Sequence, residues 1–393
     1  MRILAHEDAV PRLTRRALLG GITVVGVGAL VGCKAPGSSS TGTSGGTSSL
    51  PPGPVLTYTG KLQNHLNIYS WGDYDSPANI KAFRSDNNVK VQFDSYASNE
   101  EMIAKLQAAQ GKSGYDIVVP TGNFVPQMVA NGLLAQINLD LIPNFSHLAS
   151  EYKGQYWDPN NQYVVCKDWG TTGFVYDTTK ITNNLKSWSD FIAAATTEAA
   201  NSTTVLDDPF EFASIYLGSK GYDLNTNDAG QLAEAKDFLV NTLAPNIRAF
   251  DSDPSQSLVQ SNFALMQMYN GDCRWALLES KSASKWKFVY PTPTANLWVD
   301  NWAVTSDCAH PDTAMAFIND MLDPDVSYRE MKYNGYPTGV TGQAKRAKKD
   351  NLKMYDLVFP SQEIINRLTP QRLTDAQTTL VEILSEAKAA AAS

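Results

Sequence analysis

The segment 297–304, LWVDNWAV, places two tryptophans and an aspartate at alternate positions. Successive side chains of a β-strand point to opposite faces, so Trp298, Asp300 and Trp302 would project from one face. An aromatic ring beside a carboxylate suits an ammonium group. A cation-π contact contributes roughly 0.5 to 2 kcal/mol, and a charge-assisted hydrogen bond adds to it once water is excluded. The same pattern is also typical of an edge strand whose tryptophans pack between two lobes.

A second acidic group follows the apolar run TTVL, in the segment Asp207-Asp208-Pro209-Phe210-Glu211. With Asp208 at the N-cap, Pro209 at the first helical position and Glu211 two residues later, the segment predicts a capped helix start that needs no ligand. The alternative interpretation is that Asp208 and Glu211 neutralise a second amine at the mouth of a cleft.

Further aromatic residues stand at expected strand ends or in loops: Trp71 and Tyr74 in the loop 70–74, Tyr269 before Asn270-Gly271, and Tyr336 before a proline. Taken singly, each is more typical of packing than of ligand contact.

No catalytic pattern accompanies these residues. After residue 32 the histidines are His65, His147 and His310, and no two stand at a metal-ligand spacing. Gly111-Lys112-Ser113 resembles the end of a phosphate loop, but the earlier glycine that such a loop needs is replaced by Leu106. The sequence therefore predicts a binding protein that is not an enzyme.

Alternating short apolar runs and amphipathic segments must position these groups. We expect strands at 65–69, 90–94, 115–120, 163–168, 172–177, 203–206, 264–269, 286–290 and 297–304. We expect helices at 77–86 and 99–109, the second opened by a capping box of Ser98 and Glu101, and a largely helical stretch after Pro311. Such alternation favours an α/β protein with parallel-rich sheets, in which ligands lie at the carboxyl ends of strands or in the cleft between lobes.

Length and charge limit the class of protein further. A chain of 393 residues is too long for one small core, so two lobes are expected. Its net charge of −8 and the lack of a long basic tract argue against a nucleic-acid partner.

The first 33 residues are typical of an export signal. Arg15-Arg16 precede the uncharged stretch GGITVVGVGALVG, which ends at Cys33. The segment resembles a twin-arginine lipoprotein leader cleaved before Cys33, which would then carry the lipid. Residues 34–54 are almost wholly Gly, Ser, Thr and Pro, as in a flexible tether. Three further thiols, Cys166, Cys273 and Cys308, leave the disulfide state open.

Seven segments occur in an order that resembles one known family: IYSWGDY, SYASNEEMIAKLQA, YDIVVPTGNFVPQM, LDDPFEF, MYNGD, LWVDNWAV and NGYPTG. The chain is similar, from about Lys61 to about Gln371, to the substrate-binding proteins of bacterial spermidine/putrescine ABC importers. The resemblance implies a two-lobed periplasmic binding protein fold of type II, each lobe a mixed sheet flanked by helices. It also implies a polyamine in the interlobe cleft, no catalytic activity and no cofactor.

The resemblance also implies a set of partners. The protein would be a monomer on the outer face of the cytoplasmic membrane, anchored at Cys33, and would deliver its ligand to the permease subunits of an ABC importer. Its parts would be the leader 1–32, the lipidated cysteine and tether 33–60, one lobe of 61–170 plus about 297–336, and a second lobe of about 171–296 plus 337–393.

The ligand-contacting residues that the resemblance implies are spread over the whole body of the chain: Trp71, Tyr74, Thr121, Asp208, Glu211, Tyr269, Trp298, Asp300, Tyr336 and Gln371. Three positions depart from the family pattern. Gly72 replaces a polar residue, Asn123 replaces an aromatic one, and Tyr269 stands where spermidine binders of the family have tryptophan. These changes leave open which polyamine is bound, and another cationic or amino-acid-like solute is the alternative.

Overall fold

The computed structural model describes residues 53–260 and 262–392. The predicted leader, Cys33 and the predicted tether up to residue 52 lie outside the described residues. The strands are β1 His65–Trp71, β2 Lys90–Tyr96, β3 Ile117–Val118, β4 Val164–Asp177, β5 Thr203–Leu206, β6 Ile247–Asp251, β7 Leu265–Tyr269, β8 Trp286–Val289, β9 Asn296–Val304 and β10 Thr369–Pro370. The helices are α1 Pro77–Asn87, α2 Asn99–Ala109, α3 Val125–Ala130, α4 Trp188–Ala195, α5 Pro209–Lys220, α6 Ala229–Phe238, α7 Pro254–Gln260, α8 Asn270–Glu279, α9 Pro311–Met321, α10 Pro324–Asn334, α11 Gln343–Lys349, α12 Tyr355–Val358, α13 Gln362–Ile365 and α14 Gln377–Ala391.

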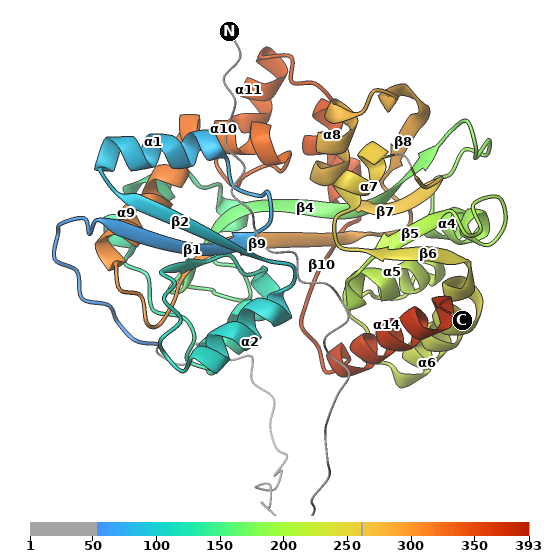
Figure 1. Ribbon diagram of the computed structural model, residues 1–393, viewed down its shortest axis with the longest axis horizontal. Helices are drawn as coiled ribbons and strands as arrows, with labels where there is room; N and C mark the ends of the chain where they lie inside the picture. Colours follow the sequence, from blue (N-terminus) through green and yellow to red (C-terminus); the bar gives the residue numbers. More distant parts are fainter. Residues whose placement is uncertain (1–52, 261, 393) are drawn as a thin grey trace, which may run out of the picture. The chain divides into compact units, whose positions relative to one another are not determined.

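The strands join into a sheet of order β2-β1-β3-β9-β4-β7-β5-β6, with β8 added to β4 and β10 to β9. Outer pairs such as β1 with β2 and β5 with β6 are parallel, as the alternation predicts. The central strands β4 and β9 are antiparallel to each other and to the neighbours β7 and β3, so the sheet is mixed. Figure 1 shows β4 and β9 running side by side between the two groups of outer strands.

Strand β4 unites two predicted strands, 163–168 and 172–177, into one element whose residues are all buried. Its register against β9 shifts between Cys166 and Asp168, which leaves Lys167 as an extra residue in a β-bulge. A bulge bends its strand and turns a side chain away from the regular alternation, so β4 can turn its one lysine inward.

The helix starts agree with the capping residues in the sequence. Ser98 accepts a hydrogen bond from the amide of Glu101 at the start of α2, although the Glu101 carboxylate reaches the amide of Ala97 instead of closing the capping box on Ser98. Asp208 caps α5 with Pro209 at the first helical position, as predicted. This cap fixes the direction in which α5 enters the fold, and with it the position of Glu211.

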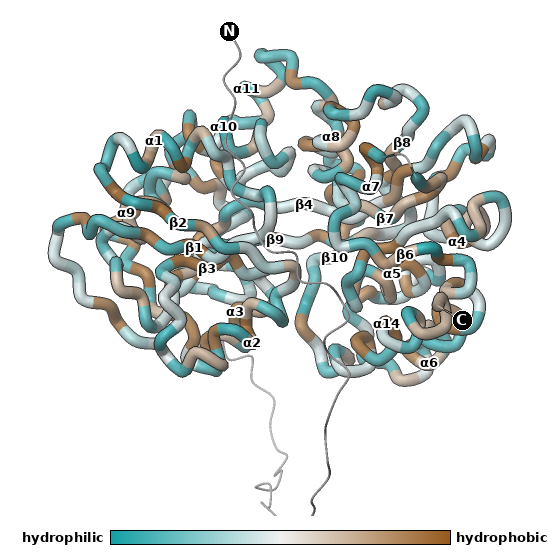
Figure 2. The backbone as a smooth tube through the Cα atoms, in the orientation of Figure 1, coloured by the Kyte–Doolittle hydropathy of each residue, from teal (hydrophilic) through white to brown (hydrophobic). Residues whose placement is uncertain are grey.

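Buried apolar side chains gather into separate clusters. The largest takes its members from residues between Leu66 and Trp169 and again between Trp298 and Val340. The second takes its members from residues between Phe174 and Val289 and from Ala376 to Ala387, at and within α14. Figure 2 shows hydrophobic and hydrophilic residues alternating along much of the chain.

Three sequence-based expectations on elements were incomplete. The predicted strand 115–120 pairs only at the two residues of β3. Strand β6 was not predicted because its sequence IRAFD is short and half-exposed at the sheet edge. The two-residue β10 contains Pro370, which disfavours a strand assignment. In the described part of the chain, no helix is both long and apolar enough to span a bilayer.

Candidate ligand-binding site

One face of β9 supplies the centre of the site. Asn296, Trp298 and Asp300 alternate along this strand, and each is at least nine-tenths buried. The neighbouring strand β4 places Gly170 opposite Trp298 and Asp168 opposite Asp300. The predicted alternation of Trp298 and Asp300 is therefore found in a central strand that is paired on both sides, not in an edge strand.

At one end of this face, two hydroxyls surround the carboxylate of Asp300. Thr121 Oγ1 donates to Asp300 Oδ1 at 2.7 Å, and Tyr74 Oη lies 2.9 Å from Asp300 Oδ2. Thr121 is itself held by the side chain of Asn99, which contacts its amide and its hydroxyl at 3.0 Å each. Burial, and then the negative charge of Asp168, raise the pKa of Asp300 to about 7. The predicted residues Tyr74, Thr121 and Asp300 thus form one polar end of the site.

Three aromatic rings stand together in the middle. The Trp298 ring meets Tyr336 edge-on at a centroid distance of 4.9 Å and meets Tyr269 at 5.9 Å. Tyr336 donates its hydroxyl proton to Asp272 Oδ1 at 2.7 Å, so its polar atom is already satisfied. The indole nitrogen of Trp298 is buried without a hydrogen-bond partner. Apolar ring surface with few free polar atoms suits the methylene part of a ligand.

Gly170 makes room for the central tryptophan. A Cβ atom at this position would lie 2.2 Å from Trp298 Cζ2 and 2.9 Å from Asn270 Oδ1. Only glycine lets β4 pass this close to the indole ring. The β4 backbone therefore packs directly against the Trp298 ring and limits its movement away from the site.

At the other end, Glu211 is buried near the start of α5. Its Oε1 accepts hydrogen bonds from Thr172 Oγ1 and from Asn296 Nδ2, both at 2.7 Å. Its Oε2 is buried without a partner, and so is Oδ1 of Asn296. Buried polar atoms are normally satisfied, so two adjacent acceptors without donors indicate a place for a donor from outside the chain.

Asp208 is half-buried and acts as the N-cap of α5, with its Oδ1 accepting from the amide of Glu211 at 2.9 Å. The capping interpretation of Asp208 is therefore confirmed, whereas its contact with a ligand stays a prediction. Burial raises the pKa of both carboxyls, and the charge of Asp208 raises the pKa of Glu211 further.

The last two predicted residues border these ends. Gln371 Oε1 accepts from Asn296 Nδ2 at 3.2 Å, which attaches it to the Glu211 end. Trp71 packs its ring on Tyr96 at 4.7 Å, and its Nε1 donates to the Val119 carbonyl at 3.1 Å. Its indole nitrogen is thus already engaged with the protein.

Comparison with known proteins agrees with this arrangement. The family model described as bacterial extracellular solute-binding protein matches residues 78–358. The chain belongs to the bacterial extracellular solute-binding proteins. The spermidine/putrescine-binding periplasmic protein of Salmonella typhimurium is 30% identical over 275 residues, which cover 70% of this chain and 77% of that protein.

Solved structures of similar proteins support the same assignment. The spermidine/putrescine ABC transporter substrate-binding protein PotD from Streptococcus pneumoniae, in complex with calcium and HEPES, has a TM-score of 0.70 and 29% identity, covering 84% of this chain and 100% of that one. The Tp0655 (TpPotD) lipoprotein of Treponema pallidum has a TM-score of 0.72 and 27% identity, covering 82% and 99%. The predicted two-lobed periplasmic binding protein fold is confirmed, and so is the family, whose members are substrate-binding proteins of transport rather than enzymes.

The structure of this solute-binding protein also contains polar groups that sequence reasoning missed. Asn296 stands two residues before Trp298, so the same alternation could have included it. Lys167 is fully buried, with its Nζ 3.2 Å from Asp168 Oδ2 and 3.4 Å from both Asp75 Oδ1 and Glu330 Oε1. The only local signal for this cluster was a Lys-Asp pair inside the apolar run VVCKDWG.

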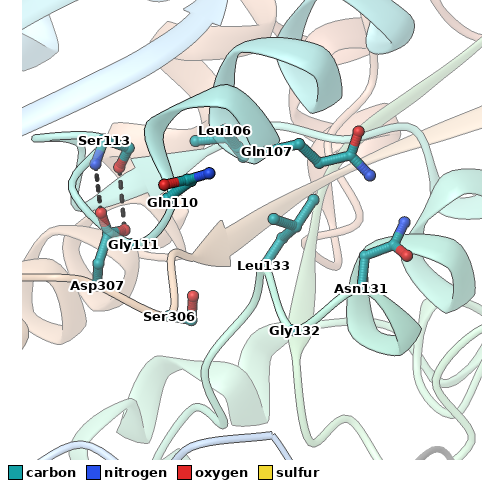
Figure 3. Close-up of a pocket in the computed structure, with 10 residues that line it drawn as sticks. All are labelled: Leu106, Gln107, Gln110, Gly111, Ser113, Asn131, Gly132, Leu133, Ser306 and Asp307. Carbon is teal, nitrogen blue, oxygen red and sulfur yellow. Dashed lines mark hydrogen bonds between the residues drawn. The ribbon is translucent and has the colours of Figure 1, made fainter.

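A separate cavity of about 300 Å³ lies at the C-terminal end of α2. Its lining consists of Leu106, Gln107, Gln110, Gly111, Ser113, Asn131, Gly132, Leu133, Ser306 and Asp307. Figure 3 shows Ser113 pointing to Asp307, whose two carboxylate oxygens accept from the amide and hydroxyl of Ser113. None of these residues belongs to the predicted site, and the one acidic group among them is already occupied.

Within residues 53–260 and 262–392, no group of three or more His, Cys, Asp or Glu side chains is arranged to hold a metal ion. Cys166, Cys273 and Cys308 are all free thiols in the structure, so none of the pairings that the sequence left open is formed.

Proposed function

We propose that this protein captures a polyamine, spermidine or putrescine, along the Asn296–Trp298–Asp300 face and delivers it to the permease of an ABC importer. One observation carries the proposal: two buried carboxyls, Asp300 and Glu211, stand at opposite ends of an aromatic surface, and Glu211 keeps an oxygen without a donor. A ligand with an amine at each end and methylenes between them matches this order of groups. The related Salmonella protein, named for spermidine and putrescine, agrees with it.

The strand itself sets the distance between the two ends. Asn296, which holds Glu211, and Asp300 are four residues apart, which corresponds to about 13 Å along a strand at ~3.3 Å per residue. One amine would meet Asp300 and Thr121, and the other would meet Glu211, with the rings of Trp298 and Tyr336 against the methylenes. Once water is excluded from the site, each contact between an ammonium group and a carboxylate would be a charge-assisted hydrogen bond.

We further propose that the protein binds its ligand without transforming it, as a monomer and without a cofactor. Its family consists of substrate-binding proteins, and the groups around Asp300 and Glu211 are hydroxyls, amides and rings suited to holding an amine. Calorimetric titration should give a one-to-one stoichiometry, with unchanged ligand recovered afterwards. Recovery of a modified amine would contradict this part of the proposal.

The proposed lobes are residues 61–170 plus about 297–336 and residues about 171–296 plus 337–393. The two main clusters of buried side chains support this division, although the first extends slightly past the boundary to Val340. Strands β4 and β9 cross from one lobe to the other. A ligand that bridges Asp300 and Glu211 would favour a closed arrangement. The radius of gyration from solution scattering should then fall when ligand is added, and a constant value would contradict closure.

We also propose that the protein is exported by a twin-arginine signal and held to the membrane by a lipid on Cys33. The leader sequence and the lipoprotein nature of the Treponema relative support this. Cells fed labelled palmitate should yield a labelled mature protein that begins at Cys33, and the Cys33→Ala variant should lose the label. An equal label in both would exclude Cys33 as the anchor.

The function is tested by calorimetric titration of the chain lacking residues 1–33 with putrescine, cadaverine, spermidine and spermine. We expect saturable binding of one of them, because the spacing of the two carboxyls selects a length. Competition by the other amines at high concentration then ranks them. If none of the four binds, the fold stands but the ligand is another cationic or amino-acid-like solute.

A further inference from the structure

A second carboxyl stands directly opposite Asp300. Strands β4 and β9 are antiparallel, and Asp168 is the cross-strand partner of Asp300. Both side chains are buried, Asp168 completely. Two like charges at directly opposed positions destabilise a sheet, and more strongly when water is excluded. Some feature of the structure must therefore compensate for this pair.

The hydroxyl of Tyr74 lies between the two carboxyls. It contacts Asp168 Oδ1 on one side and Asp300 Oδ2, at 2.9 Å, on the other. A phenol has one proton to donate, so one of these two oxygen-oxygen contacts needs a second proton. That proton must belong to one of the carboxyl groups.

The remaining contacts indicate which carboxyl holds it. Asp168 Oδ2 accepts from Lys167 Nζ at 3.2 Å and from Asn334 Nδ2 at 2.8 Å, so donors surround it and favour its ionised form. Asp300 has hydroxyl partners only, Thr121 on Oδ1 and Tyr74 on Oδ2. The hydrogen bonds are then consistent in one direction: Asp300 donates to Tyr74, and Tyr74 donates to ionised Asp168.

We propose that Asp300 carries this proton while no ligand is bound and that an incoming ammonium group displaces it. Asp168, held by Lys167, is the positioning residue whose negative charge sets the pH at which Asp300 loses the proton. The inference rests on the proposed function, because it concerns the amine bound at Asp300. The step balances simply: the protonated carboxyl loses its proton to the solvent, and the ammonium ion pairs with the carboxylate that remains.

Other titratable groups surround the three residues Asp168, Tyr74 and Asp300. From β4, Lys167 contributes a positive charge, against Asp75 in the loop after β1 and Glu330 on α10. Phenols come from β2, β7 and the loop after α10, namely Tyr96, Tyr269 and Tyr336, and burial raises the pKa of each. These phenols therefore stay neutral at acidic and neutral pH. With the pKa of Asp300 raised to about 7, the proton is present at acidic pH and about half present at neutral pH.

The expected sign of the pH dependence follows. A bound ammonium group lowers the pKa of Asp300, so binding releases a proton below the pKa of the free protein and none above it. The Asp300 proton should make amine affinity rise by up to about tenfold per pH unit between about pH 5 and pH 7, and this contribution should level off near pH 8. Glu211, whose pKa is raised to about 8, adds a contribution of its own that Glu211→Gln removes. The ligand amines stay charged over this range.

The experiment is calorimetric titration with putrescine, or with whichever amine binds, in two buffers of different ionisation enthalpy. At about pH 6 the wild type should release up to two protons per ligand, one from Asp300 and one from Glu211, whose pKa burial raises to about 8. Glu211→Gln keeps Asp300 and should release close to one proton at about pH 6 and close to none at about pH 8.5. In Asp168→Asn, Asp300 loses the opposing charge and receives the Tyr74 proton as a donor. The midpoint of proton release should therefore fall by about one pH unit or more. Asp86→Asn, an exposed aspartate on α1, should match the wild type.

A second measurement needs no ligand. Carbon-13 spectra of the carboxyl groups in the free protein should show a buried carboxyl titrating near pH 7 that is absent in Asp300→Asn and moved to lower pH in Asp168→Asn. Burial also raises the pKa of Glu330 to about 7, and the signal of Glu330 should remain in both variants. If amines bind to Glu211→Gln without proton release at about pH 6, or if the carboxyl signal lost in Asp300→Asn does not titrate near pH 7, the inference is wrong. If the carboxyl titrates as expected but no amine binds, the shared proton stands and it is the polyamine function that fails.

Discussion

Asp300→Asn is expected to weaken amine binding by about 2 to 5 kcal/mol, because a buried ammonium group would lose its charged partner. The amide keeps the shape of the side chain and can still accept from Thr121, so the packing of β9 should survive. Calorimetric titration at about pH 8, where Asp300 of the wild type is ionised, measures the full effect.

Asp86→Asn serves as the matched control, since it makes the same chemical change on the exposed face of α1. It should leave the dissociation constant unchanged within error. A wild-type affinity in a folded Asp300→Asn protein would remove Asp300 from the site and leave Glu211 as the remaining candidate for amine recognition.

Lys167→Met is expected to lower the free energy of unfolding by about 3 to 5 kcal/mol, the usual effect of removing one partner from a buried ion cluster. Three carboxylates lie within 3.2 to 3.4 Å of the Lys167 ammonium group, which also sits 3.9 Å from the centroid of the Tyr74 ring. Methionine fills a similar volume but leaves the three carboxylates without a cation. Urea unfolding, followed by circular dichroism, measures the difference.

The pH dependence of this loss has a definite sign. Burial raises the pKa of both Asp168 and Glu330, so the folded protein holds their protons more tightly than the unfolded chain does. Stability contributed in this way is lost as pH rises, and without Lys167 the effect becomes larger. The deficit of Lys167→Met should therefore grow from about pH 5 to pH 8.

Lys236→Met provides the comparison on the surface. Lys236 pairs with Glu386 at 2.6 Å, but both side chains are at least one-third exposed. Its loss should change the unfolding free energy by less than about 1 kcal/mol. If Lys167→Met were equally mild, the three carboxyls around Lys167 would have to be neutral already, and the assignment of Asp168 as an anion would be wrong.

Local patterns in the sequence predicted the parts of the site that depend on neighbouring residues. The period of two in β9 placed Trp298 and Asp300 on one face, and the capping residues placed Glu211 in the first turn of α5. Both depend on interactions within a few residues, which a single sequence records. The same reasoning applied two residues further back would have added Asn296.

The charge cluster could not be predicted in this way. Lys167 and Asp168 stand in an apolar run, but the acids that meet them, Asp75 and Glu330, come from a loop and a helix far away in the chain. The β-bulge at Lys167 depends on the register with β9, which is a property of the folded sheet. The two predicted strands 163–168 and 172–177 are continuous for the same reason: pairing with β9, β7 and β8 extends across the Gly170 region.

The alternation of β9 also restricts how ligand preference can change within the family. Substitutions can relocate a ligand-contacting side chain along one face of a strand only by two residues at a time, a step of about 6.6 Å. Adjustments of a single methylene are much smaller than this step, so substitutions within β9 are too coarse to make them. Fine selection between amines of similar length must instead come from small shifts of the helix that carries Glu211 and of the loop that carries Tyr74. Variants with altered amine preference are therefore to be sought at the start of α5 and after β1.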